Sequence, residues 1–128
     1  MMQGLADTSF FLAQEAGRPI RRDAVPERLG VSVVTIGELR AGVLSAADVE
    51  TRDRRLVTLT IAMALEPRPV DGRVAEAWAR LRMILRRDNL RMPINDSWIA
   101  ATAMSLGVPV VTQDRDFVEV AGLSVVHV

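Results

Sequence analysis

The chain has 128 residues, of which 49% are hydrophobic, with 16 basic and 16 acidic residues and a formal net charge of zero. This length predicts one small domain with its own core, and the charge balance excludes a uniformly polybasic nucleic-acid binder. Cysteine and lysine are absent and the only histidine is His127, which excludes thiolate chemistry, lysine-dependent phosphate loops and two-histidine zinc sites, and disfavours a histidine-based triad.

The hydrophobic residues are not gathered into a membrane-spanning segment. No run of 18 apolar residues occurs, so no membrane span is expected. The first residues also lack the basic start and apolar centre of a secretory signal. The simplest expected location is the cytoplasm.

The first half of the chain predicts two short strands, each followed by a helix. Residues 2–6 form a strand candidate, and Thr8 or Ser9 can cap a helix that stops at Gly17. Residues 18–27 predict a polar loop with about one helical turn. A strand at residues 30–34 precedes a helix capped by Thr35 and ending near residue 44, and Ser45 starts another helix to about residue 65.

The second half predicts two helices and then two strands. Asp71 caps a helix that reaches about residue 90, and Asn95 caps the next helix, which stops at Gly107. Trp78 and Trp98 are interpreted as core residues. Strands follow at residues 108–112 and 123–128. Strands that alternate with helices predict an α/β layered domain with a mainly parallel sheet, and residues 1–128 are expected to form one domain.

Acidic residues stand where strands end and helices begin. Asp7 follows the first strand, Glu38 lies in the helix after the second, Asp96 opens a helix, and Asp114 with Asp116 follow the third strand. In open α/β sheets these positions converge at the carboxyl edge, where ligands bind. Carboxylates that converge repel one another unless a divalent cation neutralises them, and Mg²⁺ and Mn²⁺ prefer oxygen ligands.

Each acidic residue also has a purely structural interpretation. Thr35-x-x-Glu38 can be a capping box, Asp96 can serve only the helix dipole, and Asp114 with Asp116 can belong to a solvated turn. The joint pattern, rather than any single residue, favours a metal site.

With Asp7-Thr-Ser, Thr35-x-x-Glu38-Leu, Asn95-Asp96-x-x-Ile-Ala-Ala and Thr112-x-Asp114-x-Asp116-Phe in this order, the chain resembles the PIN-domain family, and most of all its VapC ribonuclease toxins. The resemblance covers nearly the whole chain. It implies a PIN-like three-layer α/β/α sandwich with a mainly parallel central sheet and a homodimer. It also implies one or two Mg²⁺ or Mn²⁺ ions, cleavage of structured RNA such as tRNA or rRNA, and inhibition by a cognate VapB-type antitoxin.

The resemblance assigns roles to residues of this sequence. Asp7, Glu38, Asp96 and Asp114 match the acidic quartet, and Asp116 matches an additional acidic position. We expect Asp7, Asp96 and Asp114 as metal ligands, Glu38 as a ligand or a base, and Asp116 at a second ion. Hydroxyls that support these ligands are expected from Thr8, Ser9, Ser97 and Thr112.

Arginines must then hold the RNA. Arg73, Arg80 and Arg87 recur at heptad spacing on one predicted helix and are candidates for phosphate contacts, although a merely soluble helix face explains them equally well.

Two other functions remain open from the residues. Asp114-x-Asp116 resembles the Asp-x-Asp of haloacid dehalogenase phosphotransferases, but that chemistry needs the motif after the first strand and a lysine. The second alternative is a catalytically silent module that binds RNA or protein.

Overall fold

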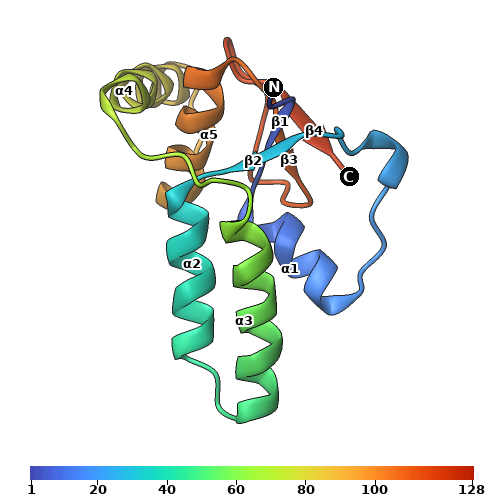
Figure 1. The fold of residues 1–128 in the computed structure, drawn as a ribbon. Coiled ribbons are helices and arrows are strands. Elements are labelled where there is room, and N and C mark those ends of the chain that lie inside the picture. The colour runs from blue at the N-terminus through green and yellow to red at the C-terminus, as the bar shows by residue number, and fades with distance from the viewer.

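The computed structural model describes residues 1–128 as an α/β fold with four strands and five α-helices. Figure 1 shows the course of the chain. The elements in chain order are β1 (Gly4–Ala6), α1 (Thr8–Ala16), the 3-10 turn η1 (Arg22–Ala24), β2 (Leu29–Val31), α2 (Val33–Leu44), α3 (Val49–Met63), α4 (Gly72–Arg87), α5 (Ile94–Leu106), β3 (Val110–Thr112) and β4 (Val125–His127).

The four strands form one parallel sheet in the order β2-β1-β3-β4. All carboxyl ends therefore lie at one edge. The chain leaves β1 for β2 on one side, while β3 pairs on the other side of β1, so the carboxyl ends of β1 and β3 flank the point where the strand order reverses. Open α/β sheets bind ligands at such a point.

Two hydrophobic clusters, one on each face of the sheet, pack the strands against the helices. Leu5 packs with residues of α4 and α5, whereas its neighbour Ala6 packs with residues of α1, α2 and α3. Val110 and Val111 of β3 divide between the clusters in the same way, as the alternation of strand side chains requires. This arrangement confirms the predicted three-layer α/β/α fold with a parallel sheet.

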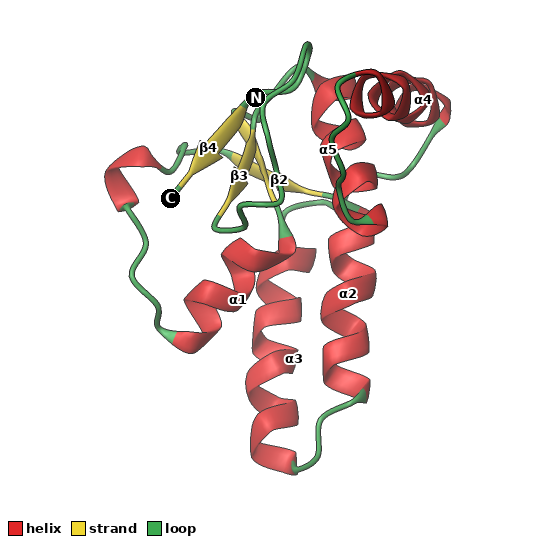
Figure 2. Ribbon diagram, turned by 180° about the vertical axis from the view of Figure 1, so that it is seen from behind, coloured by secondary structure: helices red, strands yellow, loops and turns green.

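Helices α2 and α3 pack against each other as a hairpin. Figures 1 and 2 show this hairpin extending away from the sheet, past the end at which β1 leads into α1. The first turns of α2 thus lie close to the carboxyl edge, where Glu38 accepts a hydrogen bond from Thr8, the first residue of α1.

Several predicted helix starts were wrong. Asp7 itself caps α1 instead of Thr8 or Ser9, and Ser32 caps α2 instead of Thr35. Helix α3 begins at Val49 after the cap Asp48, rather than at Ser45. Strand β2 ends early because its partner β1 has only three residues with which it can pair, so the chain turns into α2 sooner than the apolar run predicts.

The first strand is short and rich in small residues because it is closely covered. A Cβ atom at Gly4 would lie 2.7 Å from Val111 Cγ2 and 3.2 Å from Pro26 Cγ. Glycine is therefore the residue that fits between β3 and the loop before β2. None of the five α-helices has the length and apolar character needed to cross a membrane.

Candidate active site

Asp7 is a buried carboxylate at the end of β1. It accepts hydrogen bonds from the Phe10 backbone N–H at 3.1 Å, from Ser9 Oγ at 2.8 Å and from Thr112 Oγ1 at 2.7 Å. Burial raises the pKa of Asp7, and the three hydrogen bonds offset only part of that rise. The side chain is consequently fixed in position before any ligand binds.

Ser9 and Thr112 join the ends of β1 and β3. Thr112 Oγ1 accepts from the backbone N–H of Asp114 at 2.8 Å, and Ser9 Oγ accepts from the backbone N–H of Gln113 at 2.9 Å. The two hydroxyls are 3.1 Å apart. The predicted supporting residues Ser9 and Thr112 thus contact Asp7 and also orient the loop that carries Asp114. Gln113, which the sequence analysis did not single out, contributes through its backbone.

Three further carboxylates gather beside Asp7. Asp96, Asp114 and Asp116 each place one oxygen so that the three oxygens lie within 4.8 Å of one another. The Asp116 backbone N–H donates to Asp114 Oδ1 at 2.8 Å and fixes the turn after β3. Burial is the largest cause that raises the pKa of Asp96, followed by the charges of Asp114, Asp7, Glu38 and Asp116 in that order, and together they raise this pKa to about 7.

The clustered carboxylates repel one another, and a bound divalent cation would relieve this repulsion. The donor set is entirely carboxylate, without histidine or sulfur, and so fits a hard ion such as Mg²⁺ or Mn²⁺. The other four acidic residues predicted from the sequence are all close enough to Asp96 for their charges to raise its pKa. The structure therefore brings the predicted set together at one edge.

Glu38 reaches this edge from the second turn of α2. Thr8 Oγ1 donates to its Oε1 at 2.6 Å, and Asn95 Nδ2 donates to its Oε2 at 3.4 Å. Thr35 is not a helix cap but a buried residue, and its hydroxyl accepts from Thr8 at 3.1 Å. The capping-box interpretation of Thr35 and Glu38 was therefore wrong.

Asn95 was also misassigned as a cap. Helix α5 begins at Ile94 after Pro93, so Asn95 lies inside the first turn and its side chain is free to contact Glu38. The contact between Asn95 and Glu38 could have been anticipated from the sequence, because Asn95 is next to Asp96 at the helix start that faces the acidic edge.

Ser97 follows Asp96 but contacts no carboxylate. Its hydroxyl donates to the Ile94 carbonyl and accepts from Trp78 Nε1 at 3.0 Å. Trp78 stacks on Trp98 with ring centroids 4.2 Å apart and planes 1° from parallel. Both rings are half-buried rather than central in the core, and they join α4 to α5 next to Asp96.

Two of the three arginines predicted to hold RNA, Arg73 and Arg80, lie away from the acidic edge. Arg80 pairs with Glu76 at 3.2 Å, and Arg87 pairs with Asp88 at 3.2 Å. Arg73 and Arg80 lie beside Met104 near the C-terminal end of α5. Eight helical residues separate Met104 from Asp96, which corresponds to about 12 Å along the helix axis.

Comparison with known proteins identifies the fold and its relatives. The PIN domain family model matches residues 5–123. Ribonuclease VapC5 of Mycobacterium tuberculosis is 46% identical over 125 residues, which span 98% of this chain and 93% of the relative. Ribonuclease VapC4 of the same organism is 47% identical over 126 residues, which span 98% and 97%.

Solved structures agree with these relatives. The VapBC-5 toxin–antitoxin structure from Mycobacterium tuberculosis superposes with a TM-score of 0.90 at 42% identity and covers 100% of both chains. The DNA-bound VapBC structure from Salmonella typhimurium has a TM-score of 0.81 at 25% identity, with 98% of this chain and 97% of that chain covered.

The parallel α/β fold with carboxylates at its carboxyl edge defines the class of protein. The family match makes the assignment specific: this chain belongs to the PIN-domain family. Its relatives are VapC proteins, which confirms the resemblance that the ordered motifs indicated. The match leaves no basis for the haloacid dehalogenase alternative.

Proposed function

We propose that this protein is the toxin of a type II toxin–antitoxin system, a Mg²⁺- or Mn²⁺-dependent endoribonuclease that cleaves structured RNA such as tRNA or rRNA. The observation that carries the proposal is the convergence of Asp96, Asp114 and Asp116 within 4.8 Å beside the buried Asp7. The names of the relatives, which are ribonucleases, support the same reaction class.

Each acidic residue has a proposed role in phosphodiester hydrolysis. We assign Asp7, Asp96 and Asp114 as ligands of a first ion, directly or through water. Asp116 would help to hold a second ion, and its oxygen lies within 4.8 Å of one oxygen each from Asp96 and Asp114. A bound ion of this kind lowers the pKa of a coordinated water and polarises a phosphoryl oxygen. Glu38, held by Thr8 and Asn95, is positioned either to ligate or to accept the proton of the attacking water.

Three structural supports keep this geometry in place. Ser9 and Thr112 hold Asp7 by hydrogen bonds, and the Thr112 hydroxyl also fixes the backbone of Asp114. These contacts limit the freedom of the ligands before an ion binds, which is the usual role of groups behind a metal site.

We further propose a homodimer and a VapB-type antitoxin as partners, in the cytoplasm where the RNA substrate is found. The support is an exposed apolar surface on α3, where Leu56, Val57, Ile61 and Met63 are 41–60% exposed. An apolar patch of this kind on a helix indicates contact with another protein chain. The similar VapBC-5 structure from Mycobacterium tuberculosis belongs to a family of toxin–antitoxin systems, which supports an antitoxin as partner.

Incubation of purified protein with total tRNA and rRNA tests the reaction. We expect discrete fragments with Mg²⁺ or Mn²⁺ and none with EDTA. Asp7→Asn and Asp96→Asn should each reduce the rate by about 100-fold or more, because loss of a supporting group alone costs roughly 10- to 100-fold. Asp53→Asn, at an exposed position on α3, is the matched control and should cleave normally. Cleavage that persists in EDTA or in both site variants would contradict metal catalysis.

A further inference from the structure

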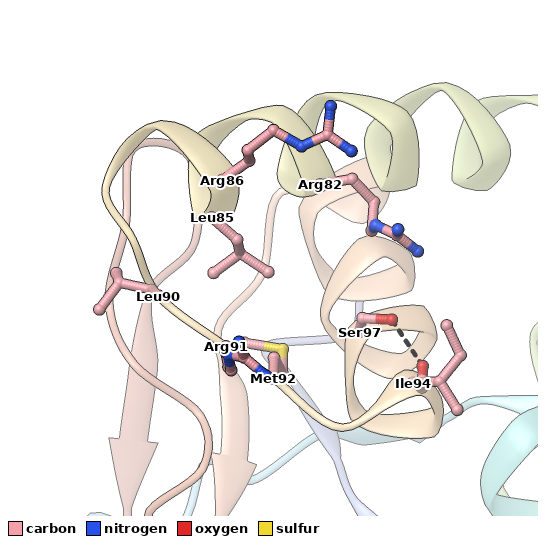
Figure 3. A pocket seen from close by; sticks show the side chains of 8 residues that line it. All are labelled: Arg82, Leu85, Arg86, Leu90, Arg91, Met92, Ile94 and Ser97. Atoms are coloured by element: carbon pink, nitrogen blue, oxygen red, sulfur yellow. Dashed lines mark hydrogen bonds between the residues drawn. The ribbon is translucent and has the colours of Figure 1, made fainter.

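A groove lies beside the acidic edge, between the C-terminal half of α4, the connection to α5 and the first turn of α5 (Figure 3). Its volume of about 540 Å³ lies within the range of roughly 300–1,000 Å³ that is common for ligand sites. The residues that line it are Arg82, Leu85, Arg86, Leu90, Arg91, Met92, Ile94 and Ser97. We call it the arginine groove.

The arginine groove carries positive charge that the protein does not neutralise. Three of its lining residues are arginines and none is acidic. The two ion pairs of the molecule join Arg80 to Glu76 and Arg87 to Asp88, so Arg82, Arg86 and Arg91 have no acidic partner. In a chain whose net charge is zero, this local excess favours an anionic ligand.

One of the guanidinium groups is held in place before any ligand binds. The Arg82 guanidinium carbon lies 4.8 Å from the centroid of the Trp78 ring, a cation–π distance. Trp78 in turn stacks on Trp98 and donates to Ser97 Oγ. A planar guanidinium fixed in this way loses little freedom when it binds a phosphate by two hydrogen bonds.

The arginine groove and the acidic edge are adjacent but separate. Ile94 and Ser97 line the groove, and Asp96 lies between them in sequence in the same helical turn. Successive helical residues point about 100° apart, so Asp96 faces the side next to that of Ser97. With a divalent cation at the acidic edge, an RNA chain could therefore place one phosphate at that edge while neighbouring phosphates occupy the groove.

We propose that the arginine groove binds the sugar–phosphate backbone of RNA at nucleotides that flank the cleaved bond. The inference rests on the proposed function, because it takes RNA as the substrate. Phosphates match the forked donors of arginine. Leu85 and Met92, which also line the groove, offer apolar contacts for ribose or base faces. An acidic segment of a protein partner is the competing occupant, and the test below separates the two.

The test measures binding without cleavage. A fluorescein-labelled 12-residue oligouridine is titrated with protein in EDTA, and anisotropy is followed from about 25 to 200 mM NaCl, the range over which phosphate contacts weaken. The test variant is Arg86→Gln/Arg91→Gln, since no hydrogen bond or ion pair of these side chains stabilises the fold. Arg73→Gln/Arg80→Gln removes the same charge from the other half of α4, and Arg82→Gln is measured third.

We expect the groove variant to bind about tenfold more weakly at low salt. Its slope of log K against log salt should fall by about 1.4, because each lost contact with single-stranded nucleic acid removes about 0.7. The Arg73/Arg80 variant should change the affinity less than about twofold. Thermal melting of each variant checks that the fold is retained.

Equal losses in both double variants would show a diffuse charge effect and overturn the proposal, as would an unchanged affinity in the groove variant. A 12-residue oligoglutamate that binds wild type, and loses affinity in the groove variant while RNA does not, would assign the groove to an acidic protein segment. Binding is measured in EDTA and is therefore separate from cleavage. If the groove binds RNA but the protein shows no metal-dependent cleavage, the proposed function fails, and only RNA binding by the groove remains.

Discussion

Asp7 and Asp96 lie at the same edge of the sheet, but the protein surrounds them differently. Asp7 is buried and accepts hydrogen bonds from Ser9, Phe10 and Thr112. Asp96 is half-buried, and burial together with four neighbouring carboxylates raises its pKa to about 7. The first corner is complete without a ligand, whereas the second is destabilised until a cation is present.

This difference separates two requirements of a metal site. A ligand that is fixed by the protein sets the geometry, and ligands that repel one another supply the driving force for binding. Changes at the Asp7 corner should therefore harm both stability and activity, while changes at the Asp96 corner should harm activity and spare or improve stability.

The largest effect on stability is expected from Thr112→Val. The substitution removes a donor to Asp7 and the acceptor of the Asp114 N–H, and unpaired buried groups cost about 1–3 kcal/mol. Urea unfolding measures the loss, and cleavage should fall by roughly 10- to 100-fold.

Thr58→Val is the matched control for this change. Thr58 is also buried, but its hydroxyl bonds only the Arg54 carbonyl within the same helix at 3.4 Å. We expect it to alter the unfolding free energy by less than about 0.5 kcal/mol. Similar losses at both positions would mean that the Thr112 hydroxyl has no special role at the site.

The second prediction is a gain in stability rather than a loss. Asp96→Asn should raise the melting temperature of the metal-free protein at pH 8 by about 3 °C. The ordinary pKa of 3.8 is raised to about 7 in the folded protein, so protonation of Asp96 favours folding. That contribution is complete below pH 3.8 and is lost as the pH rises through about 7.

Differential scanning calorimetry in EDTA at pH 5 and pH 8 checks this prediction. The gain from Asp96→Asn should be larger at pH 8 than at pH 5, where wild-type Asp96 is still protonated in the folded state. A gain that is independent of pH, or a loss at pH 8, would show that Asp96 is not under electrostatic strain.

The smallest effect is expected at Glu38. Thr8→Val removes the hydrogen bond of 2.6 Å that holds Glu38 Oε1. We expect cleavage to fall about tenfold, since a hydrogen bond to a charged group contributes about 1.5 kcal/mol at the low end of its range. Thr8→Ser keeps the hydroxyl and should restore most of the rate. Equal rates in both variants would mean that Thr8 does not position Glu38.

The sequence predicted the acidic edge well because its rule depends on order rather than on exact boundaries. Asp7 and Asp114 follow neighbouring parallel strands, and that adjacency brings them together whether each strand has three residues or five. The parallel sheet was predicted from the alternation of strands and helices, and the PIN family from the resemblance of the ordered motifs.

The errors in the helix starts arose where two nearby residues could each cap the same helix. Ser32 and Thr35 are both good caps, and only the three-residue pairing of β2 with β1 selects Ser32. Thr35 is then released to contact Thr8. Such a choice depends on strand pairing between distant segments, which local sequence preference does not contain.

The arginines show a second reason why some predictions from the sequence were wrong. Arg80 has Glu76 one turn before it and pairs with it, whereas Arg82 has Trp78 at the same spacing. Heptad periodicity drew attention to Arg73, Arg80 and Arg87. A search of α4 for arginines with no acidic residue next to them or one turn away would have pointed instead to Arg82 and Arg86, which line the groove next to the acidic edge.

Titration calorimetry with Mn²⁺ at pH 8 tests most directly whether the acidic edge is one cation site. Wild type and the control Asp53→Asn should bind one or two ions with equal affinity. Asp96→Asn should bind at least about tenfold more weakly, because it removes a ligand and part of the repulsion that drives binding. Binding of equal strength and stoichiometry in Asp96→Asn and wild type would contradict the account.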